Sequence, residues 1–445
     1  MRRLIFLAAF LFAYFFVITS CNSGTSNAKP VSIDTAGYIP PAPVKIPKED
    51  FDRYYPEVKD FYENKLLRSG FNGGILVAKK GEVIFEQYHG FFDLAKKDSL
   101  NKHSAFHLAS VSKTFTAMAT LKLAQMGKLS IDDDMKKYFP AFPYDNVTVR
   151  LLLSHRSGLP NYLYFMDKLG WDKKQHCTNE DVLDYLIKYK PKPMSKPDTH
   201  FTYCNTNYAL LGLIIEKASG ESYADFLQQE FFSPLNMKDT YVYDNLRDST
   251  TAMPSYDYRG RQEAFTYLDC GFGDKNIYST PEDLLKWDQA LYSNKIFTQK
   301  TLEEAFTPYS NEKPGIRNYG FGWRMNVYPN GKKIIYHNGW WHGNNTVFIR
   351  MIQDSVTIIV LGNKYNRNIY EAKDMEGYFD SETSLNSDEN EAMSKEEINT
   401  NESPDSILSK KIEFNKPKPK AHKSPSKKTS SKKTSSKKHH LKKKK

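Results

Sequence analysis

The chain has 445 residues, of which 40% are hydrophobic and 26% are charged, and its formal net charge at pH 7 is +11. This length excludes a small single-core module and predicts one large domain or two lobes that share a cleft. Residues 416–445 hold 14 lysines and no acidic residue, so the rest of the chain has a net charge of −3. The basic composition therefore belongs to the C-terminal segment and does not describe the folded part.

Residues 1–20 predict a secretory signal peptide. Two arginines precede an apolar run from Leu4 to Ile18, which is too short for a membrane-spanning helix. The run leads into the sequence ITSC, which resembles the lipobox of bacterial lipoproteins, so we expect a diacylglycerol on Cys21. A chance cysteine after an ordinary signal peptide is the alternative. The mature protein is expected outside the cytoplasm, and lipidation would anchor it to a membrane of the bacterial cell envelope.

Residues 21–50 are rich in Ser, Pro, Ala and Thr and predict a flexible tether. We place a folded domain after it, at residues 51–378. Its first elements are expected to be an amphipathic helix at Asp52–Arg68 and a hairpin of two strands, at Gly74–Ala78 and Val83–Tyr88.

The stretch Phe106–Gly127 predicts a helix with a nucleophile near its start. Its apolar residues recur at helical spacing with alanines between them, so the helix can be buried on nearly all sides. Ser110 and Lys113 are three residues apart and therefore share one face. A lysine out of water at the positive end of a helix dipole loses its proton more easily, so Lys113 is a candidate base for the Ser110 hydroxyl. The other serines with a lysine three residues later open no long apolar helix.

The later elements come in blocks. Further helices are expected at Asn179–Lys188, Tyr208–Ala218, Ser222–Phe232 and after the cap at Thr280, with a short helix or extended piece at Val147–Leu153. Strands are expected at Phe321–Val327, Lys333–His337, Asn345–Met351 and Val356–Leu361, which is the pattern of an antiparallel meander. This order predicts an α+β domain, with an antiparallel sheet flanked by helices and a helical lobe inserted in the middle.

Two further short motifs are Tyr203-Cys204-Asn205 and His337-Asn338-Gly339. Each is weak alone, because a tyrosine two residues before an asparagine recurs in this chain and a histidine at a strand end is usually structural. Cys177, Cys204 and Cys270 cannot complete a disulfide framework and lack metal-ligand spacing, so free thiols are expected. No metal and no cofactor are expected, since the sequence shows no ligand set and no glycine-rich phosphate loop.

From about Gly73 to Asn363 the chain resembles class C β-lactamases and penicillin-binding-protein-like serine hydrolases. The resemblance rests on six phrases in the same order as in that family: FHLASVSKTFTA, LLLSHRSGLPNY, FTYCNTNYALLGLIIEKASG, IYSTPEDLLKWDQAL, YGFGW and HNGWWHGN. It implies a β-lactamase/transpeptidase-like fold, with the active site in a cleft between the sheet and the helical lobe.

The resemblance also implies roles for individual residues. Ser110 would be the acylated nucleophile, Lys113 its activator and Tyr203 a second proton-transfer group. Asn205 would orient Lys113 and the substrate amide. The backbone N–H groups of Ser110 and Trp340 would form the oxyanion hole, where fixed donors stabilise the developing negative charge.

The chain departs from the β-lactamase pattern at the third motif. His337 stands where these enzymes usually have lysine, and together with Gly339 it would line the far wall of the cleft. A neutral imidazole is a weaker handle for a substrate carboxylate, so we expect short-chain esters or D-amino-acid amides to be better substrates than cephalosporins. Trp340 and Trp341 replace smaller residues, and their rings could narrow the cleft or make an aromatic platform, while the Trp340 amide remains usable. His155 is expected to fix a loop, and Cys204 to fill space.

The expected protein is thus a lipid-anchored serine hydrolase that acts through an acyl-enzyme on Ser110. Its substrates would be small esters, D-amino-acid amides or peptides, or β-lactams. The alternative is a catalytically weak penicillin- or peptidoglycan-binding protein of the same fold. Its expected partners are a small-molecule or peptide substrate and, through Cys21, a membrane.

Residues 379–445 are first acidic and then rich in lysine and serine, which predicts disorder. The favoured interpretation of Lys416–Lys445 is a solvated segment. One alternative is contact with an anionic lipid or envelope surface, and another is contact with the acidic residues 371–413. Nucleic acid is not an expected partner, because the protein is exported and no aromatic residue lies among the lysines.

Overall fold

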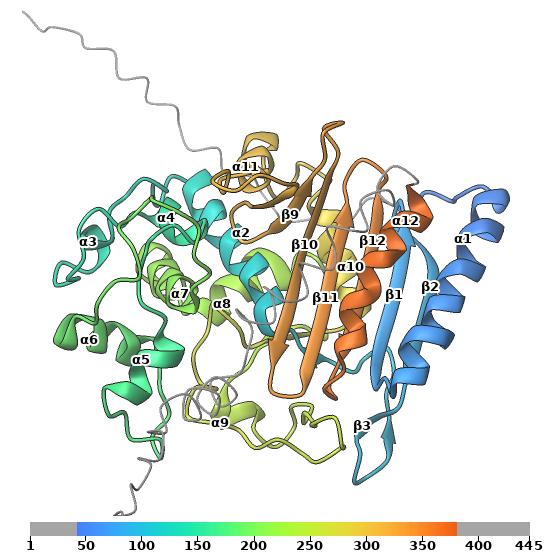
Figure 1. Ribbon diagram of the computed structural model, residues 1–445, viewed down its shortest axis with the longest axis horizontal. Coiled ribbons are helices and arrows are strands. Elements are labelled where there is room, and N and C mark those ends of the chain that lie inside the picture. The colour runs from blue at the N-terminus through green and yellow to red at the C-terminus, as the bar shows by residue number, and fades with distance from the viewer. Residues whose placement is uncertain (1–41, 381–445) are drawn as a thin grey trace, which may run out of the picture. The chain divides into compact units, whose positions relative to one another are not determined.

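The computed structural model describes residues 42–380. Their centre is a seven-stranded antiparallel sheet in the order β2-β1-β12-β11-β10-β9-β8 (Figure 1). The strands are β1 Gly73–Lys79, β2 Glu82–His89, β8 Arg317–Tyr319, β9 Arg324–Val327, β10 Lys333–Trp341, β11 Asn344–Met351 and β12 Val356–Gly362. The first strand of the domain pairs with the last, from Gly73 opposite Gly362 to Lys79 opposite Val356.

The predicted hairpin and the predicted meander are both confirmed. Strand β10 is four residues longer than expected, because its pairing with β11 continues to Trp341 opposite Asn344. Strand β9 begins three residues later than expected, after a turn in which Gly322 has a φ of +81°. Short strands that had not been predicted are β3 Phe91–Asp93, β4 Asp98–Ser99, β5 Phe106–His107, β6 Tyr241–Val242, β7 Ile277–Ser279 and β8 Arg317–Tyr319.

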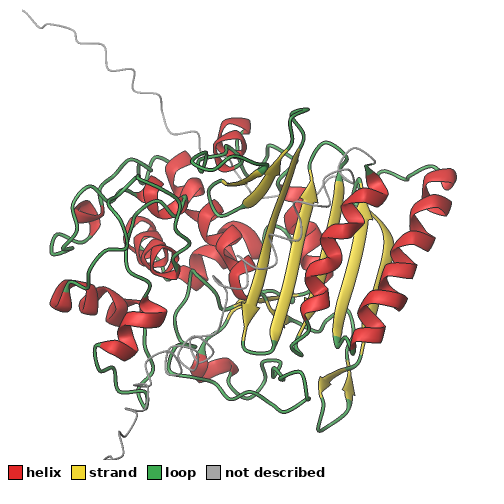
Figure 2. Ribbon diagram, in the orientation of Figure 1, coloured by secondary structure: helices red, strands yellow, loops and turns green. Residues whose placement is uncertain are grey.

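One face of the sheet is covered by the N- and C-terminal helices of the domain (Figures 1 and 2). These are α1 Lys48–Phe61, η1 Tyr62–Leu66, η2 Leu67–Ser69, η5 Arg367–Met375 and α12 Glu376–Phe379. The fold starts before the expected boundary at residue 51, because Ile46 is buried and the Val44 N–H donates to Lys80 O. It also continues past residue 378, since Phe379 packs against Tyr54 with ring centroids 4.6 Å apart.

The other face is covered by α2 Ser112–Gln125 and α10 Pro281–Ala290, beside a lobe of helices (Figure 2). The remaining helices are α3 Met135–Tyr138, α4 Val149–Leu153, α5 Tyr162–Lys168, α6 Asn179–Tyr189, α7 Asn205–Ser219, α8 Tyr223–Leu227, η4 Gln228–Phe232, α9 Asn245–Asp248 and α11 Gln299–Ala305. The expected α+β architecture is thus found, with α2 to α8 inserted between β2 and the meander.

Helix α2 is buried on all sides, as its apolar pattern predicted. Every side chain from Ser112 to Leu123 is buried, and Gly127 follows the helix with a φ of +71°. Helix α10 starts as predicted, because the Asp283 N–H donates to the Thr280 hydroxyl. Helices α5 and α11 had not been predicted, since each is only seven residues long and gives little periodic signal.

Among residues 42–380, no helix has the length and apolar character needed to cross a bilayer. The predicted signal peptide, Cys21 and the Lys-rich segment lie outside the described residues. Within them, Cys177, Cys204 and Cys270 are free thiols, as expected.

Candidate active site

The nucleophile motif lies on a tight turn at the entrance to α2. Ser110 is the middle residue of the 3-10 turn η3 (Ala109–Val111), and α2 begins only at Ser112. Ser110 therefore does not lie in the first α-helical turn, as expected, but in the short 3-10 turn directly before it. The preceding Ala109 has a φ of +49°, a left-handed conformation that is uncommon for a residue with a side chain.

Lys113 is held against the Ser110 hydroxyl. Its Nζ lies 3.0 Å from Ser110 Oγ and donates to the carbonyl oxygen of Asp274 over 2.7 Å. The side chain is fully buried, and its Nζ lies 5.1 Å from the ring centroid of Tyr203 and 5.8 Å from that of Tyr208. The structure thus joins the two residues of the first motif at a distance suited to proton transfer.

Tyr203 brings the second motif to the same place. Its hydroxyl is buried, and no described residue offers it a hydrogen bond. His155 holds the chain on both sides of this tyrosine, because the Thr202 N–H donates to His155 O and the Cys204 N–H to His155 Nδ1. Burial lowers the pKa of His155 well below its usual value, and the charges of Lys113 and Arg324 lower it further. A neutral His155 that fixes this loop agrees with the sequence interpretation.

The other two residues of the second motif have different environments. Asn205 is the first residue of α7, and its side chain makes no hydrogen bond within residues 42–380, so the described partner that orients Lys113 is Asp274 and not Asn205. The Cys204 thiol is buried and donates to Leu159 O. Burial raises the pKa of Cys204 to about 11, which leaves the thiol protonated and agrees with a space-filling role.

Strand β10 forms the wall beside the nucleophile turn. A Cβ placed on Gly339 would lie 2.3 Å from Leu108 O and 2.2 Å from Thr346 Oγ1, so this position requires glycine for the close approach of the strand. His337 is fully buried on the same strand face. Its Nδ1 is 2.7 Å from Asn338 O, and its Nε2 is 3.3 Å from the Tyr319 hydroxyl.

His337 is a neutral imidazole with both ring nitrogens occupied. Since Asn338 O only accepts, Nδ1 carries the hydrogen and Nε2 accepts from the Tyr319 hydroxyl. Burial lowers the pKa of His337 well below its usual value, and the charges of Arg324 and Lys113 act in the same direction. This imidazole therefore offers no charge and no open donor to a substrate carboxylate.

The two tryptophans lie on opposite faces of β10. Residues 337, 339 and 341 share one face, and Trp340 points to the other, where its ring lies 5.7 Å from that of Tyr365. The expectation that the Trp340 ring narrows the cleft is therefore wrong. Trp341 faces the nucleophile side, where its indole N–H donates to Asp269.

Sequence reasoning missed Arg324 and Asp274. Arg324 is the first residue of β9 and lies opposite Tyr336 of β10, and its guanidinium carbon is 5.1 Å from the Tyr203 ring centroid. Its only sequence signal was a charged residue directly after the YGFGW phrase. Asp274 contributes through its backbone carbonyl, which any residue type could supply, so no sequence pattern could have identified it.

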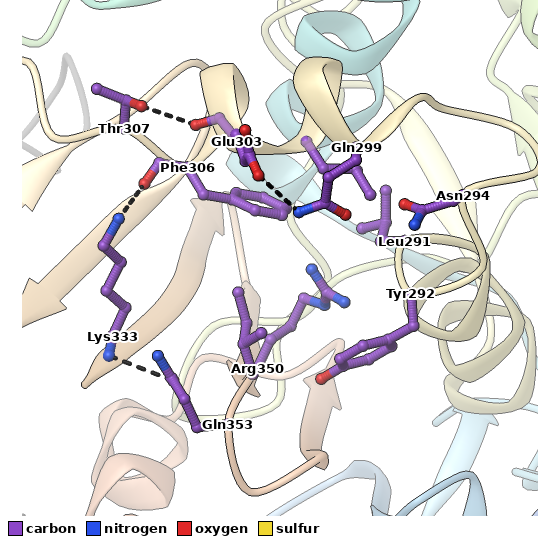
Figure 3. Close-up of a pocket in the computed structure, with 12 residues that line it drawn as sticks. Leu291, Tyr292, Asn294, Gln299, Glu303, Phe306, Thr307, Lys333, Arg350 and Gln353 are labelled. Atoms are coloured by element: carbon purple, nitrogen blue, oxygen red, sulfur yellow. Dashed lines mark hydrogen bonds between the residues drawn. The ribbon is translucent and has the colours of Figure 1, made fainter. Parts of the chain in front are cut away.

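A separate hollow of about 470 Å³ lies at the far end of β10 and β11, between these strands and α11 (Figure 3). Its lining includes Arg350, which is fully buried and is bound to Asp288 through its Nε and Nη2. The lining contains no residue of the three motifs. Within residues 42–380, no group of His, Cys, Asp and Glu side chains is arranged to hold a metal. The site with the chemistry is therefore the one at Ser110.

Comparison with known proteins gives a consistent result. The chain matches the Beta-lactamase family over residues 63–378. It is 36% identical over 317 residues to Penicillin-binding protein 4* of Bacillus subtilis (strain 168), which covers 68% of this chain and 70% of that protein. It is 26% identical over 319 residues to Protein flp of Staphylococcus aureus (strain MRSA252), of whose length the chain spans 62%.

The fold is similar to that of solved structures. The crystal structure of a penicillin binding protein from Bacillus halodurans superposes with a TM-score of 0.62 at 23% identity, covering 70% of this chain and 96% of that one. The octameric penicillin-binding protein homologue from Pyrococcus abyssi gives 0.61 at 24% identity, covering 71% and 75%. These likenesses show the β-lactamase/transpeptidase-like fold.

Proposed function

The chain belongs to the Beta-lactamase family, whose members are serine hydrolases, and from this premise we propose that it forms an acyl-enzyme on Ser110. The observation that carries the proposal is the 3.0 Å contact between Lys113 Nζ and Ser110 Oγ in a buried environment. A serine is a weak nucleophile until a neighbouring base takes its proton. Among residues 42–380, Lys113 is the basic side chain that lies within hydrogen-bond distance of this hydroxyl.

The proposed reaction has two halves. With Lys113 as a neutral amine, its lone pair accepts the Ser110 proton while Oγ attacks the carbonyl carbon of the substrate. The proton then passes to the leaving group as the scissile bond breaks. We propose the Tyr203 hydroxyl as its relay, since the Tyr203 ring centroid lies 5.1 Å from Lys113 Nζ. In the second half, water loses a proton to the same groups as its oxygen attacks the acyl carbon. Ser110 Oγ takes up this proton when the acyl–Oγ bond breaks and the acid is released. The oxyanion would be held by the backbone N–H groups of Ser110 and Trp340.

For the substrate, we propose an acyl compound that carries a carboxylate close to the scissile bond, such as a D-amino-acid-terminated peptide or a β-lactam. Arg324 supports this choice, because its guanidinium lies over Tyr203 and its charge acts on His337. The sequence expectation of an ester preference assumed that replacing lysine by His337 removes the cation from this wall. Arg324 on the neighbouring strand supplies a cation there, and guanidinium groups pair well with carboxylates.

Labelling with a fluorophosphonate and with a penicillin tests the proposal. Mass spectrometry of the intact protein is expected to show one adduct, which maps to Ser110 and is absent from Ser110→Ala. If no acylating probe modifies Ser110, the hydrolase proposal fails. A penicillin adduct that forms but is not released would instead favour the catalytically weak binding protein.

The role of Arg324 can be tested by comparing two substrates. In Arg324→Gln, we expect kcat/KM for a D-alanyl peptide or a chromogenic cephalosporin to fall about tenfold to a hundredfold, which is the usual loss of one charged hydrogen bond. The value for a neutral short-chain ester is expected to change by less than about threefold. Arg324→Lys, which keeps the charge, is the matched control and is expected to lose less. An equal loss on both substrates would contradict the assignment.

The envelope location is a proposal from the sequence alone. We propose that Cys21 is lipidated and that the hydrolase domain lies outside the cytoplasm. In cell fractions, Cys21→Ala is expected to move the protein from the membrane to the soluble fraction. Deletion of residues 416–445 from the unlipidated protein shows whether the lysines add affinity for anionic liposomes at low salt.

A further inference from the structure

A buried hydrogen bond holds the backbone directly before the nucleophile. The Ala109 N–H donates to His107 Nδ1 over 3.0 Å. The carbonyl of the same peptide, Leu108 O, accepts from Thr346 Oγ1 over 2.8 Å and from the Val111 N–H over 3.1 Å. Both polar atoms of this peptide are thus fixed, one by strand β11 and one by His107. The left-handed conformation of Ala109 persists only where its surroundings hold it in this way.

The tautomer of His107 follows from its other partner. Asn276 donates both hydrogens of its side-chain amide to carbonyl oxygens, those of Asp269 and Gly271, so its Oδ1 is left as an acceptor. His107 Nε2 lies 2.8 Å from this Oδ1 and must therefore carry the hydrogen. The lone pair of the ring is then on Nδ1, where the Ala109 N–H points.

The loop from Asp269 to Asn276 contacts both His107 and the end of strand β10, on the opposite wall of the site. Asp269 accepts from the indole N–H of Trp341 and lies 2.9 Å from His342 Nε2, and both residues come directly after Trp340. Through Asn276, the same segment fixes the ring of His107. The nucleophile turn and the end of β10, which would supply the two oxyanion donors, are thus tied to one loop.

We infer that His107 is a positioning residue for acyl transfer: its Nδ1 fixes the Leu108–Ala109 peptide and so directs the N–H and the hydroxyl of Ser110. The inference rests on the proposed acyl-enzyme function of Ser110. It requires a neutral ring, and burial lowers the pKa of His107 to about 4, although Asn276 and Asp269 act in the opposite direction. The Nδ1 lone pair is therefore available at neutral pH.

Two substitutions separate this role from simple packing. Asparagine places its amide oxygen near the position of Nδ1, so His107→Asn can still accept from the Ala109 N–H. Glutamine places its amide near the position of Nε2, so His107→Gln can bind Asn276 but leaves the Ala109 N–H without an acceptor. His103→Gln is the matched control. His103 is an exposed histidine shortly before His107 in the sequence, and among the described residues its side chain pairs only with Asp239.

The readout is inactivation by a fluorophosphonate, with the maximal rate kinact separated from the binding constant KI. For His107→Gln we expect kinact to fall about tenfold to a hundredfold, as for a misplaced reacting group, while KI stays within about twofold. His107→Asn and His103→Gln are expected to stay within about threefold of the wild type.

The outcomes separate this inference from the proposed function. If the wild type is not labelled at Ser110, the proposed function fails and the inference fails with it. If the wild type is labelled and His107→Gln reacts equally fast, only the inference is overturned. If circular dichroism shows that His107→Gln does not fold, His107→Asn decides alone. A folded His107→Asn with a kinact more than about tenfold below that of the wild type also overturns the inference.

Discussion

At the scale of single residues, two tyrosines near Lys113 differ in how their hydroxyl groups are bonded. The Tyr203 hydroxyl has no hydrogen-bond partner among residues 42–380, whereas the Tyr208 hydroxyl donates to Leu153 O over 2.8 Å. An unused buried hydroxyl contributes little to stability and is available for proton transfer, while a bonded one supports the fold.

The pair gives opposite expectations for the same chemical change. Tyr203→Phe is expected to slow acylation of Ser110 by about 10² to 10⁴ and to leave the melting temperature nearly unchanged. Tyr208→Phe is expected to lower the free energy of unfolding by about 1 kcal/mol and to leave the acylation rate nearly unchanged. Stopped-flow acylation and thermal denaturation of both variants provide the measurements. A Tyr203→Phe enzyme with the wild-type rate would remove this tyrosine from the mechanism.

The sequence was informative about residues that carry chemistry in their own side chains. Ser110 and Lys113 were predicted from their spacing on an apolar helix and Tyr203 from the family resemblance, and the three residues lie together in the structure. Arg324 was missed, because only the pairing of β9 with β10 brings it beside the motif residues. His107 was missed too, since its part depends on a backbone conformation at Ala109 that no spacing rule reveals.

At the scale of elements, strand β10 and the turn η3 are in such close contact that one residue decides their separation. A side chain on Gly339 would overlap Leu108 O and Thr346 Oγ1. Gly339→Ala is therefore expected to push the strand from the turn, to cost about 1–3 kcal/mol of unfolding free energy and to slow acylation more than about tenfold.

A second glycine, just before the same strand, provides the control. Gly331 has a φ of +85° but no atom near the position of an added Cβ. Gly331→Ala is expected to cost about 1–2 kcal/mol through backbone strain and to leave acylation unchanged. Chemical denaturation and probe labelling of both variants would decide. If Gly339→Ala and Gly331→Ala lose the same stability and the same acylation rate, the contact between β10 and η3 has no specific role in acylation.

Long elements with a clear period were predicted well, and short ones were not. Helix α2 and the meander have strong patterns, and both are found, although α2 begins at Ser112 and not at Phe106, which lies in strand β5. Helix α5, helix α11 and the small strands β5 to β7 depend on contacts with distant segments, as when β5 pairs with β7 across most of the helical lobe. A local sequence window contains no information about such partners.

At the scale of the whole molecule, buried titratable groups determine how stability depends on pH. His107, His155 and His337 stay neutral in the folded protein, while in the unfolded chain they take up protons below about pH 6.5. Each one lowers the free energy of unfolding by up to about 1.4 kcal/mol per pH unit as the pH falls from 6.5. Glu376 offsets one of them, because burial raises its pKa to about 8 and the folded state then holds its proton.

The net expectation is a loss of roughly 2 kcal/mol between pH 6.5 and 5.5, because the unfolded histidines are only half protonated at pH 6.5 and Glu376 acts in the opposite direction. Burial alone would lower the pKa of His342, but Asp269 and Glu263 raise it. The stabilising effect of His342 is therefore complete below pH 6.5 and is lost at higher pH, so this residue adds no slope in the window. Urea denaturation at pH 7.5, 6.5 and 5.5 measures the slope, with the exposed His103→Gln as control. A constant stability across these values would show that the three histidines are not buried as neutral groups.

The pairing of β1 with β12 has a consequence for how the chain is made. A ribosome delivers the N-terminal strand first, yet the strand that completes its hydrogen bonds arrives only when nearly the whole domain has been synthesised. Loop closure over such a separation is slow compared with local contacts. This delay keeps the sheet incomplete until nearly the whole domain has been synthesised. It would suit the export that we propose from the sequence, because a polypeptide with an incomplete sheet can still pass through a secretion channel.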